Sequence, residues 1–98
     1  MSLSLYLAQT IIQNTLQERS LTHLAVRVHN SSLFIYSTEQ QGETYRAAIT
    51  HFSDNLFMLS IANPRGRWQP TPFFGQVSEL LPILTDKFAF ALTRWSKV

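Results

Sequence analysis

The 98-residue sequence contains no cysteine, which excludes several kinds of chemistry. Disulfide bonds, thiolate nucleophiles and zinc sites with sulfur ligands all require that side chain. A chain without disulfides fits a reducing compartment such as the cytoplasm. At this length one domain, residues 1–98, buries about 60–70% of its unfolded surface and needs no covalent or metal cross-link.

Charged side chains are also scarce. They make up 14% of the sequence, whereas about 25% is usual for globular domains. The net charge is +2, from eight basic and six acidic residues. A surface composed mostly of serine, threonine, glutamine and asparagine has little electrostatic self-repulsion, so this composition is compatible with association between copies.

The sequence lacks a long apolar run and a secretory leader. No stretch approaches the ~18 apolar residues of a membrane span. The apolar N-terminal segment has no basic region in front of it, and Gln9, Thr10, Gln13 and Asn14 interrupt it. We therefore expect a soluble, cytoplasmic protein that makes no contact with membranes.

Motifs of catalysis and metal binding are absent as well. His23, His29 and His51 do not have the spacing of helical metal ligands, and the chain contains only two aspartates. No glycine-rich phosphate loop, GxSxG elbow or EF-hand pattern occurs. The sequence therefore predicts no catalytic residues, no metal site and no cofactor, and it favours an interaction domain over an enzyme.

Near the N-terminus, apolar residues recur at three- and four-residue spacing, which predicts an amphipathic helix over residues 4–19. Ser2 or Ser4 is the expected N-cap, because a serine hydroxyl accepts a hydrogen bond from a free N–H of the first turn. The stripe that this helix should bury contains Leu5, Ala8, Ile12 and Leu16, flanked by Ile11.

The same spacing returns near the C-terminus and predicts a second helix over residues 77–95. Ser78 is its expected N-cap, and Glu79 and Pro82 should lie in its first turn, where a missing proline N–H breaks no helical bond. Its apolar positions are Val77, Leu80, Leu81, Leu84, Phe88, Ala91, Leu92 and Trp95.

Between the two helices the hydrophobic period is two, which predicts four or five β-strands. The links are short, so the strands must be antiparallel, because a parallel connection needs a dozen or more residues. The links "QQG", "SDN" and "PRG" each fit a three-residue hairpin loop with Gly42, Asn55 or Gly66 in the left-handed region. Residues 67–69 are a candidate fifth strand, whereas residues 69–75 contain two prolines and are expected to form a connector.

These loop lengths set a register in which Ile35 lies opposite Ala47, and Ile49 lies opposite both Leu33 and Leu59. The predicted fold is α+β: an antiparallel 4–5-stranded meander with an N-terminal and a C-terminal helix packed on one face. The core face of the sheet should contain Leu24, Val26, Val28, Leu33, Ile35, Tyr45, Ala47, Ile49, Phe57, Leu59 and Ile61.

The opposite face is apolar for a surface that should meet water. Contiguous apolar patches usually mark contacts, and aromatic residues and arginine are enriched at the cores of interfaces. We therefore predict that this face binds a second copy of the chain or another protein. The predicted partner-binding residues are Arg27, Phe34, Tyr36, Arg46, Met58 and Trp68.

Other hypotheses remain for this face. In one, the connector of residues 69–75 folds back over the face and buries Trp68. In another, aromatic side chains beside arginines form a stacking platform for RNA or single-stranded DNA. Binding to phosphates would then be weak, because few arginines can cluster there: Arg27, Arg46, Arg65 and Arg67.

An enzymatic alternative rests on fold-level analogy alone. Small ribonucleases of toxin–antitoxin pairs combine helices with an antiparallel sheet, and some use arginine, histidine and tyrosine. In the predicted register Arg27, His29, Tyr36 and Arg46 share one face. A shared face is not a catalytic geometry, so the interaction domain is the favoured hypothesis.

Overall fold

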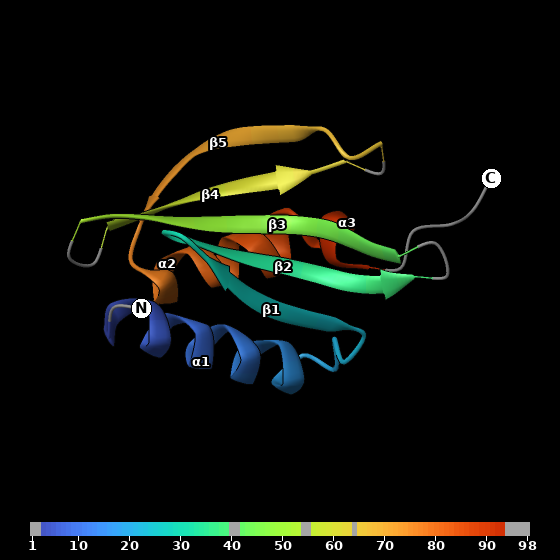
Figure 1. Cartoon of the computed structure of the whole chain (residues 1–98), viewed down its shortest axis with the longest axis horizontal. Coiled ribbons are helices and arrows are strands. Elements are labelled where there is room, and N and C mark those ends of the chain that lie inside the picture. Colours follow the sequence, from blue (N-terminus) through green and yellow to red (C-terminus); the bar gives the residue numbers. More distant parts are fainter. Residues whose placement is uncertain (1–2, 40–41, 54–55, 64, 94–98) are drawn as a thin grey trace.

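Five β-strands lie side by side in chain order, each antiparallel to its neighbour, and form one open sheet (Figure 1). The computed structural model describes residues 3–39, 42–53, 56–63 and 65–93. The elements follow one another as α1 (Leu3–Glu18), β1 (Leu24–His29), β2 (Ser32–Glu39), β3 (Gly42–Ser53), β4 (Leu56–Ala62), β5 (Trp68–Gly75), α2 (Val77–Pro82), the π-helix η1 (Ile83–Lys87) and α3 (Ala89–Leu92). This order of elements confirms the predicted α+β meander.

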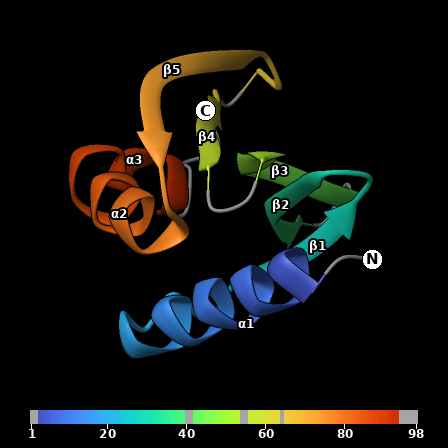
Figure 2. The ribbon, with the colours of Figure 1, turned by 90° about the vertical axis from the view of Figure 1, so that its left-hand side faces the viewer.

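The helices pack on the same side of the sheet, and we call that side the inner face. α1 contacts β1, α2 contacts β4 and β5, and α3 contacts β3. Figure 2 shows the sheet curving around these helices. The buried apolar side chains of the helices and of the inner face form one continuous cluster, which confirms the predicted placement of both helices.

The core is built from the predicted stripes with few exceptions. On α1, Leu5, Ala8, Ile12 and Leu16 are buried, whereas the flanking Ile11 is exposed. Burying a large apolar side chain contributes roughly 1.5–3 kcal/mol, so these layers supply most of the cohesion between helix and sheet. The inner face contributes Leu24, Val26, Leu33, Ile35, Ala47, Ile49, Phe57, Leu59 and Ile61, with Val28 packed at the edge of the cluster.

The predicted register of the central strands is correct. Ile35 pairs with Ala47, and Ile49 pairs with Leu33 on one side and with Leu59 on the other. The prediction is nevertheless wrong at the β2–β3 loop, where Gly42 pairs directly with Glu39. The ladder closes one residue earlier than a three-residue loop allows, although Gly42 does have the positive φ of 123°.

A β-bulge between the loop and the central pairs shifts the register by one residue. Tyr36 pairs with Tyr45 and Ile35 pairs with Ala47, so Arg46 is an extra residue on β3. A bulge of one residue reverses the faces of the side chains beyond it. Tyr45 therefore lies on the outer face and Arg46 is buried on the inner side, which is the opposite of the prediction for both residues.

The turn between β4 and β5 has the predicted geometry. The Gly66 N–H donates to the Asn63 carbonyl (2.9 Å), the Asn63 N–H donates to the Arg67 carbonyl (3.0 Å), and Gly66 has φ 80°. The Asn63 side-chain oxygen also accepts hydrogen bonds from the N–H groups of Arg65 and Arg67. In the β3–β4 turn, Ser53 pairs with Leu56; the prediction for Asn55 falls outside the described residues.

Residues 68–75 form a fifth strand, so the expectation of a connector is wrong. β5 lies at the edge of the sheet, where proline is tolerated. The pairing with β4 shifts opposite Leu59, and there the Thr71 hydroxyl donates to the Leu59 carbonyl (2.7 Å). The same hydroxyl accepts a hydrogen bond from the Phe73 N–H, so this side chain bridges the irregular part of the ladder.

The C-terminal helical region begins at Val77, as predicted, but its N-cap is Gln76 and not Ser78. The Gln76 N–H donates to the Glu79 carboxylate (2.9 Å), a reciprocal capping arrangement. The predicted cap at Ser2 lies outside the described residues; the alternative cap, Ser4, is wrong because α1 begins at Leu3 and contains that residue.

A continuous helix over residues 77–95 is not observed. Pro82 ends α2 instead of lying in its first turn, and it has no N–H to continue the helical pattern. A π-helical turn follows, closed by the Phe88 N–H donating to the Ile83 carbonyl (3.2 Å). α3 then ends at Leu92, and the prediction for Trp95 falls outside the described residues.

Among the residues that the structure describes, no helix has the length and apolar character needed to cross a membrane.

Candidate functional site

Four aromatic side chains meet on the outer face of the sheet, and we call them the aromatic cluster: Phe34, Tyr36, Tyr45 and Trp68. The ring of Phe34 lies 5.3 Å from that of Tyr45 and 5.9 Å from that of Trp68, measured between centroids. Tyr45 lies 6.2 Å from Tyr36 and 6.4 Å from Trp68. These separations are within the range in which aromatic pairs attract one another beyond simple burial.

The sheet brings these rings together from three strands. Phe34 and Tyr36 alternate on β2, and the bulge turns Tyr45 of β3 to the same side. Trp68 of β5 pairs with the buried Ala62, as predicted. The small side chains of Ala62 and Ala48 leave room above β4 and β3, so the indole reaches Phe34 and Tyr45.

A charged pair borders the aromatic cluster. The Arg27 guanidinium donates two hydrogen bonds to the Glu43 carboxylate, at 2.7 and 2.6 Å. It also lies 4.5 Å from the ring centroid of Tyr36 and donates to the Tyr45 hydroxyl at 3.4 Å. Hydrogen bonding between the two groups lowers the pKa of Glu43 and raises that of Arg27. This pair therefore brings charged groups to the border of the cluster without adding net charge.

Of the predicted partner-binding residues, the structure brings Arg27, Phe34, Tyr36 and Trp68 into one patch. Met58 lies elsewhere on β4, paired with Phe74 of β5. A second apolar group surrounds that pair, in which the rings of Phe52 and Phe74 lie 5.9 Å apart. The outer face thus carries apolar residues at both ends of its strands.

Arg46 is absent from this patch because it is buried, with 1% of its surface exposed. Its guanidinium donates to the Ser37 hydroxyl (3.1 Å), to the Ala91 carbonyl (3.3 Å) and to the Thr93 carbonyl. It also lies 3.5 Å from the Glu39 carboxylate. Carbonyls at the end of a helix favour a nearby cation, so Arg46 fixes the end of α3 to the sheet.

Sequence reasoning missed Tyr45 and Glu43 as members of the site. Both depend on the bulge at Arg46, and no residue in that segment signals where an extra residue will enter a strand. Trp68 was identified because its position relative to Gly66 fixes its pairing with Ala62.

Trp68 is not covered by the segment that follows it. Its side chain is 41% exposed, and residues 69–75 continue along the edge of the sheet as part of β5. The alternative in which this segment folds back over the face is therefore wrong. A shallow, mainly polar hollow of about 320 Å³ adjoins the indole, lined by Glu43, Thr44, Tyr45, Ala62, Arg65, Gly66 and Trp68.

Both edges of the sheet carry features that oppose strand addition. On β1, the Gln9 side chain of α1 donates to the Val26 carbonyl (3.3 Å). On β5, Pro70 and Pro72 have no N–H to offer to an added strand. Strand addition at these edges is therefore disfavoured compared with contact through the outer face.

The histidines lie apart from one another in separate environments. His23 Nε2 lies 2.8 Å from the Leu92 carbonyl, and the His51 ring stacks on Phe57 at 4.8 Å. His29 is exposed at the end of β1. Within the described ranges, no three histidine, aspartate or glutamate side chains are grouped as metal ligands would be.

No protein-family model, curated protein or solved structure matches this chain. Its function is therefore inferred from the geometry of its own residues.

Proposed function

We propose that this chain is a non-enzymatic protein-interaction domain that self-associates through the outer face of its sheet. The supporting observation is the aromatic cluster, whose rings of Tyr45 and Trp68 are more than one-third exposed. Large aromatic side chains in the centre of a contact contribute most of the binding energy at many interfaces. A group of four rings, two of them exposed and two half-buried, on the face opposite the helices suits such a contact.

The charge of the patch favours a second copy as the partner. A two-fold contact places each surface against itself, so a patch of one sign would repel its copy. Arg27 and Glu43 neutralise one another at the border of the aromatic cluster. Across a two-fold axis, Arg27 of one copy can pair with Glu43 of the other, and the contact keeps both charges satisfied.

Nucleic-acid binding is less well supported than it was from sequence alone. Of the four arginines that were candidates for phosphate contacts, Arg46 is buried and Arg27 is bonded to a carboxylate. Arg65 and Arg67 remain in the β4–β5 turn. Each lost contact lowers affinity, because counterion release scales with the number of phosphates neutralised.

The proposed location is the cytoplasm, because a chain without cysteine has no disulfide bonds that its reducing conditions would break. The proposed activity needs no cofactor and no metal ion, since it consists of burying one surface against another.

Light scattering after size exclusion tests the proposal at micromolar concentration. We expect a mass of at least two copies of the 11.3 kDa chain, and a lower mass for Trp68→Ala at the same concentration. Phe90→Ala is the matched control, because Phe90 is an exposed aromatic residue of α3, away from the outer face. A monomer at every concentration, or an equal effect of both variants, would rule out the proposed interface.

A further inference from the structure

A second apolar surface runs along α1, beside the stripe that the core buries. Leu3, Leu7 and Ile11 follow one another at four-residue spacing, so they lie on one side of the helix. They are 72%, 51% and 43% exposed. We call these three residues the α1 stripe.

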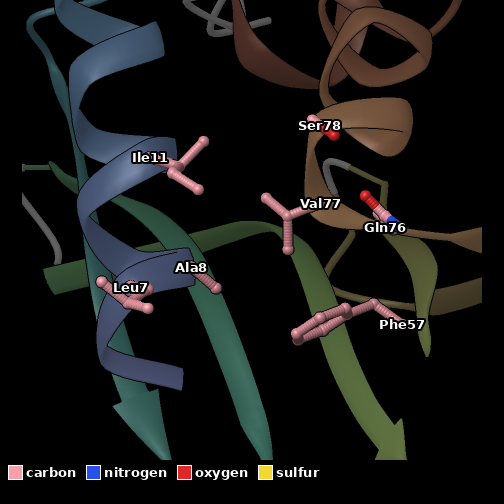
Figure 3. A pocket seen from close by; sticks show the side chains of 7 residues that line it. All are labelled: Leu7, Ala8, Ile11, Phe57, Gln76, Val77 and Ser78. Atoms are coloured by element: carbon pink, nitrogen blue, oxygen red, sulfur yellow. The ribbon is translucent and has the colours of Figure 1, made fainter. Parts of the chain in front are cut away.

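The α1 stripe borders a groove between α1 and α2. Figure 3 shows Ile11 of α1 and Val77 of α2 pointing toward one another across it. The groove has a volume of about 200 Å³, and its lining includes Leu7, Ala8 and Phe57. Pockets for small-molecule ligands usually measure ~300–1,000 Å³. This one is of a size for one or two inserted apolar side chains.

The charges of α1 indicate what kind of partner fits. Residues 3–17 include no charged side chain, and the single charge of the helix is Glu18 at its C-terminal end. The dipole of α1 is negative at that end and does not favour the Glu18 carboxylate, and the adjacent Arg19 pairs with Asp86. The first turn of α1, where a carboxylate would be favourable, contains no acidic residue. If a second copy of α1 packs antiparallel to the first, Glu18 of each helix lies near the N-terminal end of the other, where the dipole favours a carboxylate.

We propose that α1 pairs antiparallel with α1 of a second copy. Leu7 of each copy packs against Ile11 of the other and enters the groove beside Val77. In this register Glu18 of each copy reaches the N-terminal turn of the other helix, where the dipole is positive. The uncharged residues between these ends create no repulsion between the two copies.

This contact is separate from the outer face and does not depend on it. Leu3, Leu7 and Ile11 offer on the order of 300 Å² per copy, about 600 Å² in total, which is well below the ~1,200 Å² of a standard stable interface. The contact is therefore weak by itself. Combined with a contact through the outer face, it joins pairs of copies into assemblies larger than a dimer.

Glu18→Lys is the sharper test, because it moves two properties in opposite directions. A cation at the end of α1 suits the dipole of its own helix, so the melting temperature of the monomer should rise slightly. The same cation would face the positive end of the second copy, and the dissociation constant should increase about fivefold. Gln17→Lys is the control, because it places a lysine one residue away, beside β1, and should leave association unchanged. Equal effects of the two variants on association would overturn the proposal.

A second comparison separates this contact from that of the outer face. We expect Leu7→Glu and Trp68→Ala each to reduce the mass of the assembly, and the double variant to be monomeric. Gln13→Glu, an exposed change on the same helix, serves as the control, and circular dichroism checks that each variant is folded. If Leu7→Glu leaves the mass unchanged, the α1 contact is wrong. If Leu7→Glu alone produces monomers and Trp68→Ala has no effect, the outer-face contact is wrong and the α1 contact stands.

Discussion

At the scale of single residues, Arg46 determines how the sheet and the C-terminal helices are joined. Its charge is removed from water, which is costly unless hydrogen bonds replace the lost hydration. Four groups from two parts of the chain do so: Ser37 and Glu39 of β2, and the carbonyls of Ala91 and Thr93. The residue therefore acts as a structural tie and not as a surface contact.

Replacing this tie should destabilise the fold. We expect Arg46→Met to lower the free energy of unfolding by about 3 kcal/mol, because it leaves buried carbonyls without donors. Urea denaturation measures the change. Arg65→Met removes an exposed arginine in the β4–β5 turn and should change stability by less than about 0.5 kcal/mol. Equal stability of the two variants would mean that the guanidinium does not tie the helix to the sheet.

The Arg27–Glu43 pair has a pH dependence with a defined sign. Folding lowers the pKa of Glu43 below its ordinary value of 4.5, so the pair contributes stability above that pH and loses it as the pH falls through the lowered value. Wild type should be more stable than Glu43→Gln at pH 7, and the difference should disappear at low pH. Urea denaturation at both pH values measures this, and a difference independent of pH would exclude the ionised pair as its cause.

At the scale of elements, hydrophobic period and turn composition were sufficient for most of the fold. The change of period from about 3.6 to 2 and back predicts α1, the meander and a helical C-terminal region, and "PRG" predicts a turn that the structure confirms around Gly66. These signals are local. The bulge at Arg46 has no such signal, because a loop shorter by one residue and an extra residue in the strand together give the same central register as the predicted loop.

β5 was missed for a different reason. Two prolines argue against a central strand but not against an edge strand, and sequence alone does not say which strand will be at the edge. The change from α-helix to a π-helical turn after Pro82 was missed because the prediction placed this proline in the first turn, whereas in the structure it is the last residue of α2.

The prolines of β5 should protect the molecule from aggregation. We expect the double variant Pro70→Val, Pro72→Val to gain backbone donors on an exposed edge and to aggregate faster on heating. Turbidity during a thermal ramp measures the effect. Ala25→Val, at an exposed position of the opposite edge strand β1, adds a β-branched side chain but no backbone donor and serves as the control. Unchanged turbidity in the proline variant would show that β5 is protected by other means.

At the scale of the whole molecule, the low charge limits the partners that it can bind. We expect single-stranded RNA to bind more weakly than micromolar at physiological salt, with an affinity that falls further as salt increases. Filter binding over a salt series measures both quantities. Submicromolar affinity would favour the stacking-platform hypothesis over self-association, and cleavage of the RNA would favour the ribonuclease hypothesis.

The tie between Arg46 and the end of α3 also affects the order in which the chain becomes stable during synthesis. Arg46 is on β3, but two of its hydrogen-bond acceptors are the carbonyls of Ala91 and Thr93, which the ribosome adds more than forty residues later. The hairpins of the meander involve neighbouring segments and can pair early, because local contacts close short loops. The guanidinium cannot be buried favourably until those late residues emerge. In a nascent chain that ends before these residues, water still surrounds Arg46 on the inner face of the sheet. The inner face packs completely only after α3 has been synthesised.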